Sequence, residues 1–224
     1  MFTGLLVSLF LLNKKADRFL IGGERVFGVP LENLARTYIP DFGLVPVFMV
    51  QACSLLSERL CTVGLFRKPG SLPRIKTLRA KLNRGEDCLS TALPYDVATL
   101  VKQFCRELPE PLFPSVLHTA ILKAQALPKQ EARSSALQLL SCLLPAKNAS
   151  TLYPNLTLLF VLSFCSCNDN LMTSSNLATV FVPCLLPPPN QSEMSESRLE
   201  LRVLVLRTFI ENPQQFGKYS CTNA

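Results

Sequence analysis

The chain has 224 residues, of which 48% are hydrophobic and 17% charged, as expected for one globular domain with a substantial core. Its net charge of +7 and its pI near 9.0 point to acidic partners, such as a phosphate-bearing ligand, an acidic protein surface, nucleic acid or anionic lipid. The sequence has no Trp, four Tyr and fourteen Phe, and its basic residues are not interleaved with aromatic ones, which argues against a base-stacking nucleic-acid surface.

The nine cysteines are an odd number, and most lie within apolar stretches. These are Cys53, Cys105, Cys142, Cys165 and Cys184. The pattern predicts reduced core thiols in a cytoplasmic or nuclear protein, not a disulfide framework. Cys165 and Cys167 form a single CxC within an apolar run, which we interpret as core. Because there is no CxxC and His118 is the only histidine, we expect no metal site and no cofactor.

Residues 1–12, MFTGLLVSLFLL, allow more than one interpretation. They resemble the apolar part of a secretory signal, and the sequons at Asn148, Asn155 and Asn190 would suit secretion. No positive charge precedes the run, however, and it is too short to span a bilayer. We favour packing against the domain, or an atypical start to the chain. Residues 1–25 are therefore set apart as an N-terminal extension whose role the sequence leaves open.

Residues 13–28 read as a connection, and residues 45–60 as the first helix of the domain, with Pro46 in its first turn. One face of this helix carries Met49, Cys53, Leu56 and Leu60. The stretch GLFRKPGS at residues 64–71 follows directly. It places Arg67 just after two apolar anchors, so the guanidinium could project from a rigid base. The alternative is a helix end running into a polar turn with an incidental arginine.

A second helix is predicted over residues 73–84, with Gly85 as its stop. Its apolar stripe consists of Leu72, Ile75, Leu78 and Leu82. Its other faces carry Arg74, Lys76, Arg79, Lys81 and Arg84. Such a basic face either serves solvation or reinforces the binding of an acidic partner at the preceding loop.

The third helix lies within PYDVATLVKQFCRELPEPL. Its core face is Val97, Leu100, Val101, Phe104 and Leu108. Lys102 and Arg106 then fall one turn apart on the opposite face, which we expect to be exposed. Two cations at this spacing repel each other slightly, so either an anionic partner covers them or they are ordinary surface residues.

The remaining elements also read as helices, over residues 113–127, 129–144 and 152–167, followed by NLATVFVPCLL ending near Pro183. Residues 173–175 supply N-cap candidates for the latter, and Asn176 in its first turn either helps the cap or points outward to a ligand. His118 reads as an ordinary helix residue. A loop at residues 187–197, a last amphipathic helix and a fraying tail at residues 216–224 complete the chain.

No segment shows convincing strand alternation and none repeats, so the sequence predicts an all-α, single-domain bundle of about eight or nine helices. The usual enzyme motifs are absent: there is no phosphate-binding GxxxxGKS, no GxSxG elbow and no HExxH. A self-contained catalytic site is therefore not expected.

Three blocks together resemble the Rho GTPase-activating (RhoGAP) domain family: GLFRKPGS, LVKQFCRELPEPL and MTSSNLATVFVPCLL, in the family's order and close to its spacing. The resemblance covers residues 26–217 and leaves 218–224 as a C-terminal tail. The stretches GGERVFGVPL and DCLSTALPYDVATLVKQF are especially similar to the Rho GTPase-activating protein eleven subfamily.

The resemblance implies an all-helical domain that docks on a GTP-bound Rho-family small GTPase and completes its active site. Arg67 matches the family's arginine finger. Lys102 and Arg106 match two cations that contact the GTPase or brace the finger loop, and Asn176 matches an asparagine at the same surface. RhoA-type proteins are the favoured targets, and a monomer without membrane insertion is expected.

Three residues depart from the family pattern. Val63 stands where an acidic residue is common, Pro69 where a serine usually follows the finger, and Cys184 where the family has asparagine. These departures keep an alternative open, a RhoGAP-like module that binds GTPases or other acidic partners without activating hydrolysis.

Overall fold

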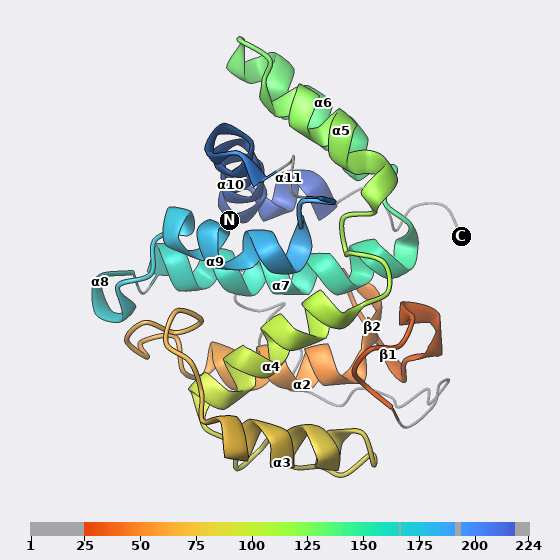
Figure 1. Ribbon diagram of the computed structural model, residues 1–224, viewed down its shortest axis with the longest axis vertical. Coiled ribbons are helices and arrows are strands. Elements are labelled where there is room, and N and C mark those ends of the chain that lie inside the picture. The colour runs from red at the N-terminus through yellow and green to blue at the C-terminus, as the bar shows by residue number, and fades with distance from the viewer. Residues whose placement is uncertain (1–24, 166, 191–193, 218–224) are drawn as a thin grey trace.

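The computed structural model describes residues 25–165, 167–190 and 194–217, and within them the chain is a helical bundle (Figure 1). The described helices are α2 (Val47–Ser57), α3 (Leu72–Leu82), α4 (Pro94–Glu107), α5 (Ser115–Gln125), α6 (Gln130–Ser141), α7 (Ala146–Cys165), α8 (Cys167–Asn170), α9 (Ser174–Leu185), α10 (Glu196–Glu211) and α11 (Pro213–Gly217), with a 3-10 turn η1 (Leu31–Asn33). The predicted all-α class is confirmed. The short helices α8 and α11 were not predicted as separate elements from the sequence.

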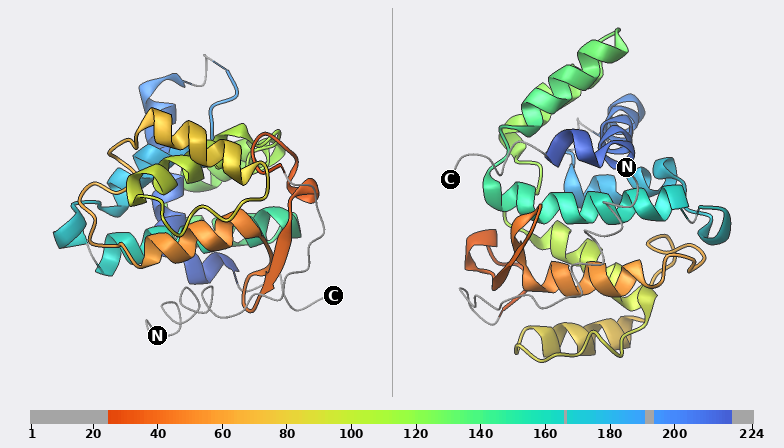
Figure 2. Two further views of the ribbon diagram at one scale, coloured as in Figure 1. Left: turned by 90° about the horizontal axis from the view of Figure 1, so that it is seen from below. Right: turned by 180° about the vertical axis from the view of Figure 1, so that it is seen from behind.

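Helix α7 is the centre of the bundle, as its nearly continuous apolar sequence predicted. Helices α2, α9, α10 and α11 all pack on it. Every described position of α7 from Asn148 to Leu159 is buried. Figures 1 and 2 show α3 outermost on one side, where it packs on α4, and the α5–α6 pair projecting at the opposite end. The two sides of the bundle therefore present different surfaces.

The prediction that the chain has no strands was wrong. Strands β1 (Arg36–Ile39) and β2 (Gly43–Pro46) form an antiparallel hairpin in which Tyr38 faces Leu44. Each strand has only four residues, so its alternation is too short to stand out. Its stability comes from distant packing: the Ser150 hydroxyl of α7 donates to the Leu44 carbonyl at 2.7 Å.

Two helix ends differ from the prediction. Leu72, assigned to an apolar stripe, is 69% exposed. Helix α9 continues through Pro183 to Leu185 instead of ending there. A proline inside a helix removes one backbone donor, and buried Val182 and Cys184 on either side of Pro183 keep the helix packed in the core.

The thiol predictions are confirmed in part. Cys53, Cys105 and Cys184 are buried free thiols, whereas Cys142 is exposed on the end of α6. The side chains of Cys165 and Cys167, and the residues 1–12 and 218–224, lie outside the described part of the structure. In the parts that the structure describes, no helix is long and apolar enough to cross a membrane.

The sequons within α7 are not accessible. Asn148 and Asn155 are both buried, and the Asn148 amide donates to the Leu112 carbonyl at 3.2 Å. An asparagine so enclosed cannot carry a bulky glycan in the folded domain.

The residue that begins the predicted fraying tail is part of the core instead. Phe216 of α11 is only 3% exposed, and its ring centroid lies 4.1 Å from that of Phe209 in α10. The Ser141 hydroxyl of α6 also donates to the Phe216 carbonyl at 3.4 Å. The packed domain therefore includes α11.

We expect Phe216→Ala to lower the free energy of unfolding by about 3 kcal/mol, because it removes a buried aromatic side chain and leaves a cavity. Gln215→Ala, at the exposed neighbouring position, is the matched control and should change it by no more than about 0.5 kcal/mol. Urea denaturation followed by circular dichroism measures both. Equal effects of the two substitutions would mean that α11 is not part of the cooperative unit.

Candidate functional site

The loop at residues 64–71 presents Arg67 from a rigid base. Leu65 and Phe66 are fully buried, while Arg67 is exposed. The Phe66 ring meets Phe181 of α9 edge to face, with centroids 4.9 Å apart. Phe66 has φ of 69°, a backbone region that non-glycine residues rarely adopt and that costs about 1–2 kcal/mol. Packing of the ring in the core holds this conformation and turns the next side chain outward.

Asn170 holds the start of this loop. Its backbone carbonyl accepts from Gly64 N–H at 2.7 Å. Its fully buried side-chain amide donates to the carbonyls of Leu60 and Leu162, each at 2.9 Å, and its Oδ1 accepts from Met172 N–H at 2.7 Å. One buried asparagine therefore ties the end of α7, the start of the loop and the approach to α9 together. Sequence reasoning missed it, because polar NDN looks like an ordinary loop.

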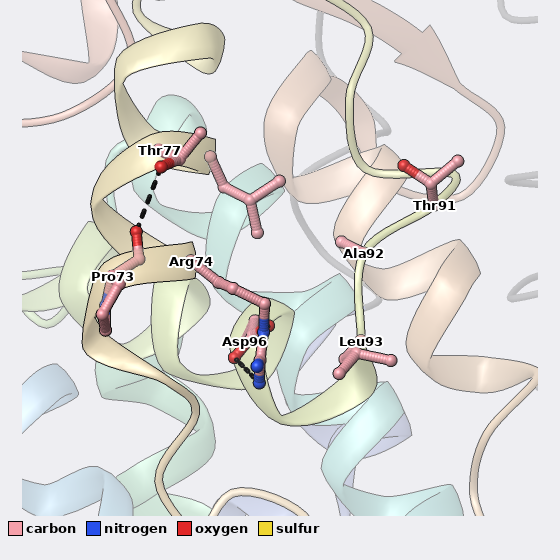
Figure 3. Close-up of a pocket in the computed structure, with 8 residues that line it drawn as sticks. Pro73, Arg74, Thr77, Thr91, Ala92, Leu93 and Asp96 are labelled. Carbon is pink, nitrogen blue, oxygen red and sulfur yellow. Dashed lines mark hydrogen bonds and ion pairs between the residues drawn. The ribbon is translucent and has the colours of Figure 1, made fainter.

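Asp96, in the first turn of α4, holds the end of the loop. This buried carboxylate accepts from Ser71 N–H at 2.8 Å and pairs with Arg74 Nε at 2.6 Å. Figure 3 shows Arg74 reaching from α3 to Asp96 at the floor of a groove of about 310 Å³ between α3 and the segment before α4. The role of Asp96 was also missed. Its place directly before the core-facing Val97 could have indicated a buried, paired carboxylate.

Gly70 lets the loop lie against α4. Its N–H donates to the Thr99 hydroxyl at 3.1 Å. A Cβ placed on Gly70 would lie 2.4 Å from Asp96 Oδ1 and 2.7 Å from the Asp96 Cα, closer than real Cβ contacts. The site therefore requires glycine here for close approach.

Lys102 is not on the exposed face that the sequence predicted. It is half-buried, and its ammonium donates to the Phe66 carbonyl at 2.5 Å. Burial lowers the pKa of Lys102, and the nearby Arg106 lowers it further, while Cys184 acts in the opposite direction. Lys102 thus braces the backbone immediately before Arg67.

Arg106 is exposed, as predicted, and Asn176, for which the sequence left two alternatives open, is also exposed. Arg106 lies one turn after Lys102, on the same side of α4. The backbone N–H of Asn176 donates to the Thr173 hydroxyl at 3.2 Å and so forms the cap of α9. The Asn176 side chain is exposed to solvent. Both views in Figure 2 place the loop before α3 at the same end of the bundle as α8, which precedes α9. Among the described residues no hydrogen bond links Arg67, Arg106 and Asn176 to one another.

The three departures from the family pattern lie around this loop. Pro69 is exposed and has no backbone N–H to donate. The backbone donors that fix the loop belong to the residues on either side of it. The Val63 carbonyl accepts from the Tyr95 hydroxyl at 2.8 Å. Cys184 is buried, and burial raises its pKa to about 11 even though Arg106 and Lys102 act to lower it.

The described residues give little support to a metal site or to catalysis by histidine. They contain no group of three or more His, Cys, Asp or Glu side chains that could hold a metal ion. His118 is buried with its Nε2 2.7 Å from the Phe113 carbonyl, and burial lowers its pKa. It serves the packing of α5, as its sequence context predicted.

Comparisons with known proteins identify a family for this chain. The RhoGAP domain family matches residues 46–190. The chain is 43% identical to human Rho GTPase-activating protein 11A over 88% of its length, and 41% identical to mouse StAR-related lipid transfer protein 8 over 73%. It spans only 19% and 16% of those two proteins.

Solved structures show the same fold. Human Rho GTPase activating protein 15 aligns with a TM-score of 0.76 at 24% identity, covering 86% of this chain and 92% of that one. The BH domain from Graf, the GTPase regulator associated with focal adhesion kinase, aligns with a TM-score of 0.69 at 28% identity, covering 75% and 92%.

We expect Gly70→Ala to destabilise the domain by about 1–3 kcal/mol, because the added methyl group must displace the loop from the backbone of α4. Pro69→Ala at the exposed neighbouring position is the control and should have a much smaller effect. Denaturant midpoints of both variants test this. A Gly70→Ala variant as stable as the unaltered chain would show that the loop can move away from Asp96 freely.

Proposed function

The chain belongs to the RhoGAP domain family, and from this membership we propose that it accelerates GTP hydrolysis by a Rho-family small GTPase, with Arg67 inserted in trans as an arginine finger. The observation that carries the proposal is the exposed Arg67 on a loop whose preceding residues are fully buried. The RhoGAP domain lies within residues 26–217 in this proposal and needs no cofactor.

The chemistry follows from charge. Transfer of the γ-phosphoryl group spreads negative charge over its oxygens and the bridge to the β-phosphate. A guanidinium can donate several hydrogen bonds to these oxygens in a fixed plane. Its insertion also excludes water, which strengthens the interaction. A finger supplied in trans contributes roughly 10³ to 10⁵ in rate, equivalent to about 4–7 kcal/mol.

The geometry supports this role because the finger's base is already ordered. Phe66 is packed against Phe181, and Lys102 bonds to its carbonyl. Little conformational entropy is then lost in the backbone when the arginine enters a GTPase active site. The side chain alone has to be ordered.

The other site residues divide between two roles in this proposal. Lys102 positions the finger loop, whereas exposed Arg106 and Asn176 contact the GTPase surface. The partner is a GTP-bound GTPase, for which RhoA-type proteins are the favoured choice from the subfamily similarity. We propose a monomeric domain that acts in the cytoplasm or nucleus.

A second candidate function rests on Pro69 and Cys184. A buried thiol at position 184 presents no amide to a partner, and Pro69 lies two residues after the finger. A domain altered in this way could bind a GTPase or another acidic partner without stimulating it. The two functions differ in one measurable quantity, the rate of GTP hydrolysis in the complex.

Single-turnover GTP hydrolysis by RhoA at saturating domain separates them. We expect the unaltered chain to stimulate hydrolysis, and Arg67→Ala to reduce the stimulated rate by about 10³-fold or more while binding persists. Arg67→Lys should also fail, because it keeps the charge and loses the planar fork. Lys129→Ala, an exposed cation at the far end of the bundle, is the control and should leave the rate unchanged. Binding without stimulation by the unaltered chain would select the second function.

Lys102→Met and Arg106→Ala should affect different parameters. Lys102→Met removes the brace on Phe66, so we expect it to lower the maximal single-turnover rate at saturating domain by about tenfold. Arg106→Ala should instead weaken association, and more at low salt than at high salt, because its charge is exposed. Titrations at two ionic strengths distinguish the two effects. If Lys102→Met changed only the salt-dependent association, its role would be contact with the partner rather than support of the loop.

A further inference from the structure

Leu171 combines an unfavourable backbone conformation with an exposed side chain. Its φ is 59°, in the left-handed region that leucine rarely adopts, and its side chain is 54% exposed. Phe66 has a similar φ of 69°, but its ring is fully buried in the core. Packing within the domain therefore explains the conformation of Phe66 and gives no reason for a leucine at position 171. A strained residue that folding does not explain is a candidate for a function.

Val63, a second exposed apolar residue, lies beside Leu171. Its side chain is 40% exposed. The peptide group that joins Val63 to Gly64 donates its N–H, at 2.7 Å, to the carbonyl of the peptide group that joins Asn170 to Leu171. One hydrogen bond thus connects these two peptide groups, so the two exposed side chains begin at neighbouring points of the backbone. Each alone would be ordinary on a protein surface. Together, Val63 and Leu171 are here called the apolar pair.

The apolar pair lies next to the base of the proposed finger. The N–H groups of Arg67 and Lys68 both donate to the Gly64 carbonyl at 2.9 Å, so the loop turns back on the residue that follows Val63. The Lys68 side chain covers Gly64, because a Cβ placed there would lie 3.2–3.3 Å from three of the lysine's side-chain carbons. These carbons extend the apolar area from Val63 toward Arg67.

On its other side, the apolar pair adjoins the start of α9. Met172, which follows Leu171, is fully buried, and the Thr173 hydroxyl then caps α9. Asn176, a proposed GTPase contact, lies in the first turn after this cap. Figure 2 shows the loop before α3 at the same end of the bundle as α8, which directly precedes Leu171. The apolar pair therefore connects the finger loop with the segment that leads to Asn176.

We propose that the apolar pair docks against an apolar, uncharged area of the GTPase surface that borders its nucleotide site. This inference rests on the proposed function, because the occupant is the GTPase into which Arg67 inserts. A partner that receives Arg67 also covers the residues whose backbone is bonded to the same turn. A charged side chain placed against Val63 and Leu171 would lose water without gaining a hydrogen bond. The pair therefore favours Rho-family members with hydrocarbon at this place, and contributes to affinity and partner choice.

The affinity of the whole chain for RhoA loaded with a non-hydrolysable GTP analogue tests this proposal. We expect Leu171→Asn and Val63→Ser each to raise the Kd, measured by isothermal titration calorimetry, by about tenfold, because each removes buried hydrocarbon from the interface. The loss should be nearly the same at low and high salt, unlike that of Arg106→Ala. The maximal single-turnover rate at saturating domain should change by less than about twofold, since Arg67 is unaltered.

Thermal unfolding separates this role from a structural one. Asparagine adopts the left-handed conformation more readily than leucine. We therefore expect Leu171→Asn to have a Tm equal to or above that of the unaltered chain while it binds RhoA more weakly. Leu139→Asn on α6 and Val116→Ser on α5 are the matched controls, at side chains that are 70% and 86% exposed on the projecting helix pair. These two controls should change the Kd by less than about twofold.

Three results would overturn this inference alone. Unchanged affinity of both apolar-pair variants for RhoA, with tight binding by the unaltered chain, would show that the GTPase does not cover the pair. A lower maximal rate with unchanged Kd would make the pair a support of the finger loop. A dimer of the unaltered chain in analytical ultracentrifugation that Leu171→Asn abolishes would assign the pair to a second copy of the chain. Failure of the unaltered chain to bind any Rho-family GTPase would overturn the proposed function and this inference together.

Discussion

The arrangement around Arg67 depends on buried hydrogen bonds at both ends of its loop. Asn170 bonds three backbone groups from different segments and offers its own carbonyl to Gly64, while Asp96 bonds Ser71 and Arg74. Buried polar groups are costly unless they are satisfied, and removing one partner leaves the other unpaired. These bonds favour the loop conformation in which Phe66 is buried and Arg67 is exposed.

Lys102 adds a third constraint of a different kind. An ammonium half-buried beside a second cation is unfavourable, which the lowered pKa of Lys102 reflects. Its bond to the Phe66 carbonyl offsets part of this penalty. The same bond supports a residue in an unusual backbone conformation. A strained backbone, a desolvated cation and an exposed arginine within a few residues are typical of a site selected for function more than for stability.

Hydrophobic periodicity predicted the helices well, because α4 and α7 carry their signal within their own sequence. It failed where structure depends on distant partners. The hairpin needs α7, Asp96 acts on residues more than twenty positions away, and Asn170 bonds a carbonyl 110 positions away. Spacing placed Lys102 correctly on the helix but could not show that its ammonium bonds to the Phe66 carbonyl. The candidate residues thus came from motifs, and their supports only from the fold.

The same buried carboxylate links the arginine loop to helix α3. Asp96 fixes the end of the arginine loop through Ser71 and the start of α3 through Arg74. Its position therefore fixes the angle between the arginine loop and the outward face of α3. Removing that carboxylate would leave Ser71 N–H and Arg74 without their shared partner, so the arginine loop and the start of α3 are constrained together.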